Sequence, residues 1–234
     1  MLHSFPLQWS RSRPDADLHL SVFEPDRAPQ LRGVRSHELK AVGHRVVFLD
    51  GLAVLGREDT WAQLSPRAAV EELVVLADWL ITGDEPYSGV PAATTIDELD
   101  RAIARRGRMR GVRSLRQARD LARYGSLSPQ ETRPRLAMVA AGLPEPSLNH
   151  RIVDRDGALV AMVDLAYPDQ RIAIEYQGDH HRTVKSVYRD DILRRERLTE
   201  RGWSVIFTTA EDVASPAYLI VRLRRLLAST GKSS

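Results

Sequence analysis

Between residues 148 and 178 the chain holds three apolar runs with only short links, and this arrangement limits the possible folds most strongly. The runs are LNHRIVD (148–154), ALVAMVDLAY (158–167) and RIAIEYQG (171–178). They are short and rich in β-branched residues, which is typical of β-strands. The segment YPDQ joins the second run to the third and has the composition of a tight turn. We therefore expect three consecutive strands, of which the last two form a hairpin.

Helical patterns surround these strands. Helices are expected at 128–142, 186–202 and 215–229, and a fourth strand is expected at 203–209. The resulting order, α-β-β-β-α-β-α, is typical of a mixed sheet flanked by helices, in the α/β or α+β class.

Residues 1–125 have a different character and are expected to form a smaller mixed α/β region, which gives a boundary before residues 126–234. Ser65 is expected to cap one of its helices, and Thr95 and Glu98 form a capping box at another. The expected strands of a small sheet are 18–23, 32–39 and 44–55, and the expected helices are 65–81, 95–107 and 112–125.

The composition excludes several kinds of protein. The 234 residues include no cysteine, which rules out disulfides, thiolate zinc sites and cysteine nucleophiles. No apolar stretch approaches the ~18 residues of a membrane span, so we expect no membrane partner and a cytoplasmic location.

Arginine is concentrated in one part of the chain. The formal net charge is only +3, but the run from Arg101 to Arg123 contains nine arginines and a single acid, Asp120. A solvated helix face is one explanation. The other is a footprint for nucleic-acid phosphates, in which Arg105 and Arg108 would take part.

The third strand ends in an unusually polar string, EYQGDHHR, at 175–182. Side chains two apart on a strand share one face of the sheet, and so do residues opposite each other in a hairpin. If the turn brings Tyr167 opposite Gln170, Asp164 and Glu175 become diagonal neighbours on one face, ~7–8 Å apart. Two carboxylates so placed can bind a hard cation such as Mg²⁺. Alternatively, both acids simply face solvent.

These residues carry a resemblance to a known family. Asp164 and the segment Glu175-Tyr-Gln177 resemble the (P)D…(D/E)-x-K signature of restriction-type nucleases. The blocks IEYQGDHHR, RDDILRRERLTERGW and AGLPEP extend the resemblance to the Vsr-like endonuclease domain, over about residues 128–229. Residues 1–125 are more faintly similar to the antitoxin-like region that precedes such domains.

The resemblance implies a restriction-endonuclease-like fold and an endonuclease that cleaves DNA with Mg²⁺ or Mn²⁺. It implies that Asp164, Glu175 and the carbonyl of Tyr176 hold the metal ion. Glu131, on the preceding helix, would reach the metal or its water. Its position three residues after Ser128 fits a helix capping box equally well.

Further site residues follow the third strand. His181 matches the family histidine and is a candidate general base, because its ordinary pKa is near 6.5. Arg182 and Arg194 are candidates for phosphate contacts, although Arg194 also has the spacing of an ion pair with Asp190.

Gln177 stands where the nuclease signature has a lysine. An amide can orient water, but it neither takes a proton nor supplies charge. The alternative function is therefore a catalytically weak or inactive nuclease-fold protein that binds DNA or regulates a toxin–antitoxin partner. In that case residues 1–125 would bind the partner protein.

Overall fold

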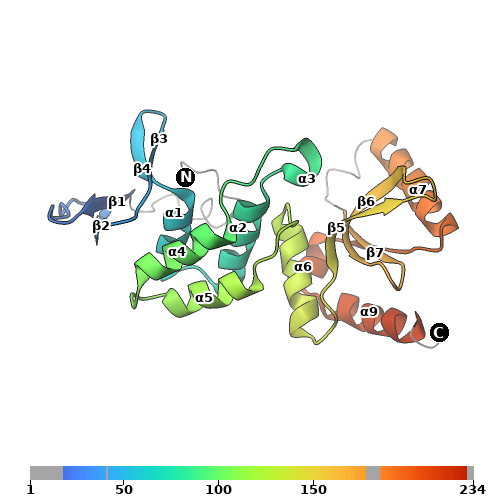
Figure 1. The fold of residues 1–234 in the computed structure, drawn as a ribbon. Helices are drawn as coiled ribbons and strands as arrows, with labels where there is room; N and C mark the ends of the chain where they lie inside the picture. The colour runs from blue at the N-terminus through green and yellow to red at the C-terminus, as the bar shows by residue number, and fades with distance from the viewer. Residues whose placement is uncertain (1–17, 41, 178–184, 231–234) are drawn as a thin grey trace.

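The computed structural model describes residues 18–40, 42–177 and 185–230. His180, His181 and Arg182 therefore lie outside the described residues. Figure 1 shows the first half of the chain on one side and the sheet of the second half on the other, with helix α6 (Pro129–Ala140) between them. The protein is thus a mixed α/β structure, as the sequence predicts.

The first half begins with two small two-stranded sheets. Strands β1 (Leu18–Phe23) and β2 (Val34–Leu39) pair in parallel, and β3 (Val46–Leu49) and β4 (Leu52–Leu55) form a hairpin. The single strand expected at 44–55 is therefore wrong. Asp50 and Gly51 both have positive φ, 49° and 79°. This backbone suits the two-residue turn of a hairpin.

Helices form the core of the first half. Trp61 lies at its centre, fully buried, and its indole N–H donates to the carbonyl of Leu73 at 2.9 Å. The helices are α1 (Arg57–Leu64), α2 (Val70–Thr82), α3 (Glu85–Ser88), α4 (Ile96–Arg106) and α5 (Val112–Leu121).

One helix start was predicted correctly and another was not. The capping box of Thr95 and Glu98 is present at α4. Ser65 does not begin a helix: it follows the end of α1, and its hydroxyl donates to the carbonyl of Ala62 at 2.8 Å. The helix expected at 65–81 therefore starts only at α2, because the five residues after α1 turn the chain.

The second half contains the predicted mixed sheet, in the order β5-β6-β7-β8. The first three strands are antiparallel, and β8 runs parallel to β7. The elements are β5 (Ser147–Val153), β6 (Leu159–Tyr167), β7 (Ile172–Tyr176), α7 (Lys185–Glu200), β8 (Ser204–Thr208), α8 (Ala210–Ala214) and α9 (Ala217–Thr230).

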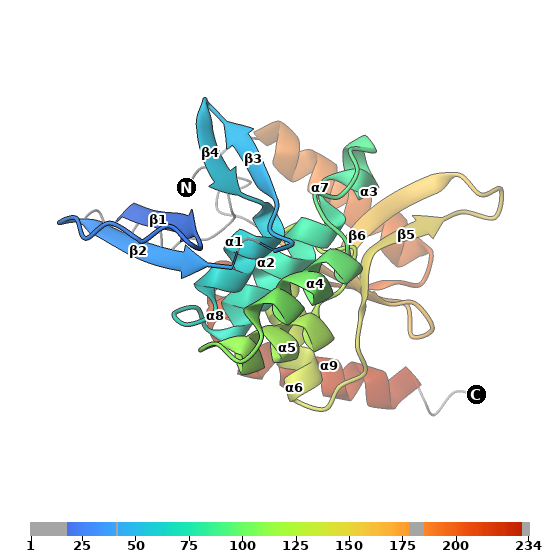
Figure 2. The same ribbon diagram turned by 60° about the vertical axis from the view of Figure 1, so that its left-hand side comes forward.

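Helices cover both faces of this sheet (Figures 1 and 2). Leu165 and Ile174 pack with residues of α6 and α9, whereas Ala166 and Ala173 pack with Leu198 of α7. Neighbouring residues of one strand thus enter different cores, as the alternation of side chains along a strand requires. This burial on both sides explains why the sequences of β6 and β7 are almost entirely apolar apart from Asp164 and Glu175.

The register of the β6–β7 hairpin differs from the predicted one by two residues. Tyr167 pairs with Ile172 rather than with Gln170. The turn is therefore longer, and residues 168–171 all lie outside the ladder. A shift of two preserves the face of every side chain, so Asp164 and Glu175 still share a face.

No helix of the described residues is long and apolar enough to cross a membrane.

Candidate active site

Asp164 and Glu175 lie near each other where the β6–β7 ladder ends. The last ladder pair is Leu165 with Ile174, so the next residues on the two strands are Asp164 and Glu175. In place of a further ladder bond, the backbone N–H of Tyr176 donates to Oδ2 of Asp164 at 2.7 Å. The two acids are therefore closer to directly opposite than to diagonal. Both side chains are only partly exposed.

Arg194 of α7 supplies a positive charge to this site. Its Nη2 lies 3.0 Å from Oε2 of Glu175, and the same nitrogen donates to the carbonyl of Met162. The guanidinium is about one-third exposed and Glu175 is 12% exposed. The side chain of Asp190 is not among those that the structure describes, so the expected ion pair between Arg194 and Asp190 stays a prediction.

Burial dominates the electrostatics of Asp164. Its pKa is raised, first because burial disfavours the charged carboxylate; the Tyr176 N–H and the charge of Arg194 act in the opposite direction. A partly buried carboxylate whose charge is incompletely compensated is more typical of a functional site than of a solvated strand face. This geometry favours the first of the two interpretations of these acids.

Glu131 is linked to the same site through Asn149. On β5, the residues before and after Asn149 pair with the residues after and before Asp164 on β6. Asn149 is therefore level with Asp164. The amide Nδ2 of Asn149 donates to Oε2 of Glu131 at 2.7 Å. Burial raises the pKa of Glu131, and the charge of Asp164 raises it further.

Both oxygens of Glu131 are already engaged inside the protein. Its Oε1 accepts from the hydroxyl of Ser128 at 2.7 Å, and its Oε2 also accepts from the N–H of Leu127 at 2.9 Å. The Ser128 hydroxyl makes no capping bond to the helix backbone. Glu131 therefore organises the start of α6 and holds Asn149 beside Asp164, which is a positioning role.

The first half of the chain holds α6 in place. Asp78 of α2 is fully buried, and its Oδ2 accepts from Nη2 of Arg135 at 2.9 Å and from the hydroxyl of Thr132 at 2.8 Å. Its Oδ1 accepts from the N–H of Arg123 at 2.7 Å. Arg135 also pairs with Glu145 at 2.8 Å. This network connects α2 to the helix that carries Glu131.

Sequence reasoning missed Tyr87, on the short helix α3. The pKa of its phenol is raised, first by partial burial and then by the charges of Asp164 and Glu131. Tyr87 is nevertheless exposed over 62% of its surface. An exposed aromatic ring close to the acids is suited to contact a substrate. The sequence contains no signal for it, because α3 is brought to the sheet only by the tertiary fold.

The remaining candidates around β7 are only partly described. Gln177 directly follows β7, and its backbone N–H donates to the carbonyl of Thr208 at 2.8 Å. This bond fixes the chain at the end of the strand. Tyr176 contributes its N–H to the site, whereas the resemblance implied its carbonyl. The roles of His181 and Arg182 remain predictions.

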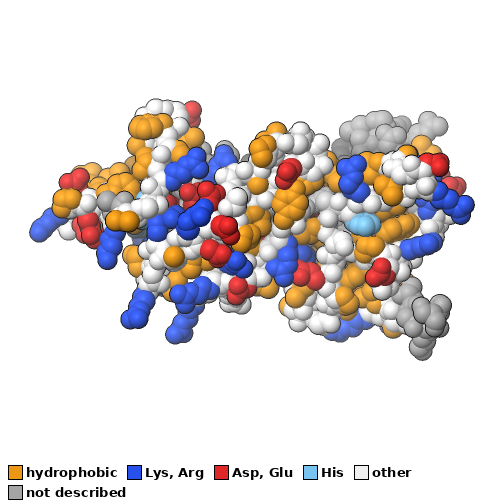
Figure 3. All heavy atoms as spheres, in the orientation of Figure 1, with side chains coloured by type: hydrophobic (Ala, Val, Ile, Leu, Met, Phe, Trp, Pro, Cys, Tyr) orange, Lys and Arg blue, Asp and Glu red, His pale blue; other side chains and the backbone are white. Residues whose placement is uncertain are grey.

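The arginine run divides into paired and exposed members. Arg105 pairs with the buried Asp59 at 2.7 Å and Arg119 with Asp100 at 2.6 Å. Arg105 is therefore engaged in holding α4 to α1, which leaves it poorly placed for a phosphate. Blue side chains gather below α4 and α5 in Figure 3. The exposed members are Arg101, Arg108, Arg110, Arg113 and Arg116.

The donor set at the end of β6 and β7 fits a hard cation only with additional ligands. Asp164 and Glu175 offer carboxylate oxygens, which Mg²⁺ prefers, and Mg²⁺ commonly takes one or two carboxylates and keeps several waters. The described residues contain no group of three or more His, Asp or Glu side chains placed to hold a metal ion. A two-carboxylate site completed by water is thus the arrangement that these residues fit.

Comparisons with known proteins identify relatives without an assigned activity. Two curated proteins of Mycobacterium tuberculosis, "Uncharacterized protein MT2308" (strain CDC 1551 / Oshkosh) and "Uncharacterized protein Rv2248" (strain H37Rv), are each 33% identical to the chain over 132 residues. The match covers 56% of this chain and 48% of each relative, so the chain spans about half the length of these proteins. No protein-family model and no solved structure matches the chain.

The buried Glu131 predicts a pH-dependent stability. Burial raises its pKa from 4.5 to about 7. The folded state therefore holds a proton that the unfolded state releases, and stability should fall as pH rises from ~4.5 to ~7 and level off above. Asp78 and Asp164, whose pKa values are also raised, act in the same direction.

Replacing Glu131 with glutamine removes one titrating group, so the change in the pH dependence of stability measures the contribution of Glu131. Between pH 5 and 7, the free energy of unfolding of Glu131→Gln should fall by roughly 1–3 kcal/mol less than that of wild type. Urea unfolding at several pH values in the presence of a chelator measures it. If the free energy of unfolding has the same pH dependence in wild type and variant, Glu131 does not titrate in this range.

Proposed function

We propose that the protein is a metal-dependent endonuclease that hydrolyses phosphodiester bonds in DNA, with Mg²⁺ or Mn²⁺ held by Asp164 and Glu175. The observation that carries the proposal is the meeting of these two partly buried carboxylates at the end of β6 and β7, next to the guanidinium of Arg194. The same proposal includes a restriction-endonuclease-like fold for the second half of the chain. The mixed sheet order and the resemblance of residues 128–229 support it.

Each residue of the site has a role in this chemistry. When bound, the metal ion polarises a phosphoryl oxygen and lowers the pKa of a bound water. Asp164 and Glu175 hold the ion, and the N–H of Tyr176 keeps the Asp164 carboxylate oriented. Glu131 positions Asn149 beside Asp164. Tyr87 offers a ring against which a base of the DNA can stack.

Arg194 supplies the positive charge that Gln177 lacks. The signature lysine would follow Glu175 by two residues on the same strand, but a guanidinium reaches Glu175 from α7 instead. In the transition state this group can stabilise the extra negative charge of the phosphate, and such preorganised charge is often the largest catalytic contribution.

This role gives a prediction for Arg194. We expect Arg194→Ala to lower the single-turnover cleavage rate by about a hundredfold, because the site loses the cation that contacts Glu175. Arg194→Lys should retain part of the rate. Adding Gln177→Lys to Arg194→Ala should recover activity, since the charge returns from the strand. A wild-type rate for Arg194→Ala would remove Arg194 from the mechanism, and a loss that Gln177→Lys does not recover would show that the charge of Arg194 is not what the reaction needs.

The decisive experiment for the function itself is cleavage of supercoiled plasmid by the purified full chain. Nicked or linear product is expected with Mg²⁺ or Mn²⁺, and none with a chelator. Linear duplex, single-stranded DNA and RNA should be tested in parallel to define the substrate. Absence of metal-dependent cleavage on every substrate would favour the alternative, a nuclease-fold protein that binds DNA or a partner without cutting. Gln177 and the ion pair that occupies Glu175 are the features that favour this alternative.

A further inference from the structure

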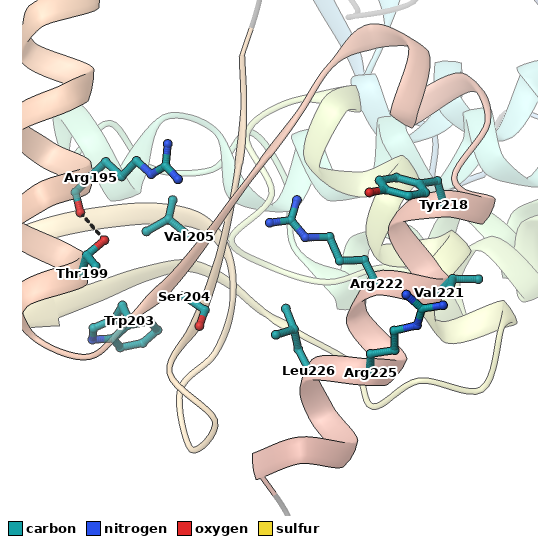
Figure 4. Close-up of a pocket in the computed structure, with 10 residues that line it drawn as sticks. All are labelled: Arg195, Thr199, Trp203, Ser204, Val205, Tyr218, Val221, Arg222, Arg225 and Leu226. Carbon is teal, nitrogen blue, oxygen red and sulfur yellow. Dashed lines mark hydrogen bonds between the residues drawn. The ribbon is translucent and has the colours of Figure 1, made fainter.

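A cleft of about 490 Å³ lies where β8 meets α7 and α9 (Figure 4). Strand β8 is at the edge of the sheet and pairs with β7 on one side. Arg195 of α7 reaches the cleft from one side, and Arg222 and Arg225 of α9 reach it from the other. We call this site the arginine cleft.

The charge of the arginine cleft is uncompensated. Among the described residues, no Asp or Glu lines it. The ion pairs of the described residues lie elsewhere and involve none of the three arginines. Figure 4 shows the guanidinium groups of Arg195 and Arg222 pointing toward each other above Ser204 and Val205. Like charges that face each other in a recess repel, and an anion between them relieves that repulsion.

One of the arginines is held in position by an aromatic ring. The guanidinium of Arg195 stacks over the ring of Phe207 at 5.8 Å from its centroid. Arg222 and Arg225 are three residues apart on α9, so they lie on neighbouring positions of one helix face. A planar guanidinium that is oriented by a ring, with two further guanidinium groups within the same cleft, suits the bidentate recognition of phosphate oxygens.

Aromatic rings stand at both ends of the arginine cleft. Trp203 lies at one end, below Arg195, and Tyr218 lies at the other, beside Arg222 (Figure 4). Tyr218 is 72% exposed, although a tyrosine ring is largely apolar. Trp203 is partly buried and packs against the core, so Tyr218 is the ring that is open to a base. An exposed ring next to arginines is the combination that contacts both the bases and the phosphates of nucleotides.

The arginine cleft is separate from the carboxylate site. On β8, Ser204 is level with Ile172 of β7, whereas Phe207 is level with Glu175. Three residues of strand correspond to ~10 Å. Ser204 thus lies at the beginning of the two parallel strands and the acids lie at their end, whereas Arg195, which stacks on Phe207, is the cleft residue on the side of the acids.

We propose that the arginine cleft binds a phosphate ester that carries an aromatic base. The phosphate lies between Arg195 and Arg222, with Arg225 at its margin, and the base stacks on Tyr218. A free nucleotide and a nucleic-acid strand share this chemistry. The inference does not depend on whether the protein hydrolyses DNA.

Isothermal titration of the full chain in the presence of a chelator tests the proposal. The probes are inorganic phosphate, thymidine monophosphate and a short single-stranded oligothymidylate. We expect Arg195→Ala combined with Arg222→Ala, and also Arg222→Glu alone, to weaken binding by about tenfold or more. The matched control is Arg197→Ala, which removes an exposed arginine of α7 outside the cleft. Far-ultraviolet circular dichroism confirms that each variant is folded.

The outcomes separate the sources of the phosphate. Equal affinity for the monophosphate and the oligonucleotide indicates a free nucleotide, whereas much tighter binding of the oligonucleotide indicates a strand. The small probes, inorganic phosphate and thymidine monophosphate, should lose affinity in the cleft variants Arg195→Ala with Arg222→Ala, and this loss is measured without metal ion and therefore independently of the proposed nuclease site. The proposal is overturned if no probe binds, if Arg197→Ala weakens binding as much as the cleft variants, or if the monophosphate binds no tighter than inorganic phosphate.

Discussion

Replacing Arg135 with methionine is expected to destabilise the protein by about 3–5 kcal/mol, which corresponds to a fall of roughly 10 °C in Tm. Arg135 and Asp78 are each 1% exposed, and their ion pair is 2.9 Å long. Burial raises the pKa of Asp78, and the charge of Arg135 is the largest factor that opposes this shift. Without Arg135 the carboxylate is left buried beside Thr132 and the N–H of Arg123, and this cost is the reason for the large effect.

Arg133 offers a matched control on the same helix. Its pair with Glu71 has a similar length, 3.0 Å, but the two side chains are 31% and 53% exposed. Arg133→Met should therefore cost at most ~1 kcal/mol, as exposed ion pairs do. Urea unfolding of both variants measures the difference. Equal midpoints would mean that the Asp78 network does not hold α2 and α6 together.

A double-mutant cycle shows whether the two side chains act as a unit. Asp78→Asn alone should also be strongly destabilising, because Asp78 accepts hydrogen bonds from three groups. The combination of Asp78→Asn and Arg135→Met should cost less than the sum of the single changes. Once one side chain of the pair is replaced, the other has already lost its partner, so replacing it costs less. Additive effects would contradict a direct interaction.

The second half of the fold could largely be predicted because its signals are local. Apolar runs mark β5, β6 and β7, and Ser128 with Pro129 marks the start of α6. Side-chain alternation also placed Asp164 and Glu175 on one face, and that conclusion survived a two-residue error in register. Alternation with a period of two cannot distinguish registers that differ by two, so the turn length had to come from the structure.

Long-range contacts explain what the sequence could not reveal. Arg194 and Glu175 are 19 positions apart, and only the packing of α7 against β6 brings them together. Local spacing points only to a neighbour on the same helix, Asp190, four residues earlier. In the same way, Asp78 and Arg135 look like ordinary surface residues of two helices until those helices pack on each other.

Replacing Asp164 with asparagine is expected to lower metal-dependent DNA cleavage by a factor of about a thousand or more, or ~4 kcal/mol of transition-state stabilisation. The amide keeps the shape of the side chain and an oxygen that can accept from Tyr176, but it removes the charge that would hold the metal ion. Glu175→Gln should have a comparable effect on cleavage. Single-turnover cleavage of supercoiled plasmid at saturating Mg²⁺ measures both variants.

A stability measurement separates this loss from unfolding. Burial raises the pKa of Asp164, so its charge is unfavourable in the folded protein without metal. Asp164→Asn should therefore leave the Tm in chelator unchanged or higher, while Mg²⁺ should raise the Tm of wild type more than that of the variant. Asp169→Asn is the matched control, because Asp169 is exposed in the turn of the same hairpin. Normal cleavage by Asp164→Asn, or equal losses in Asp164→Asn and Asp169→Asn, would place the chemistry elsewhere.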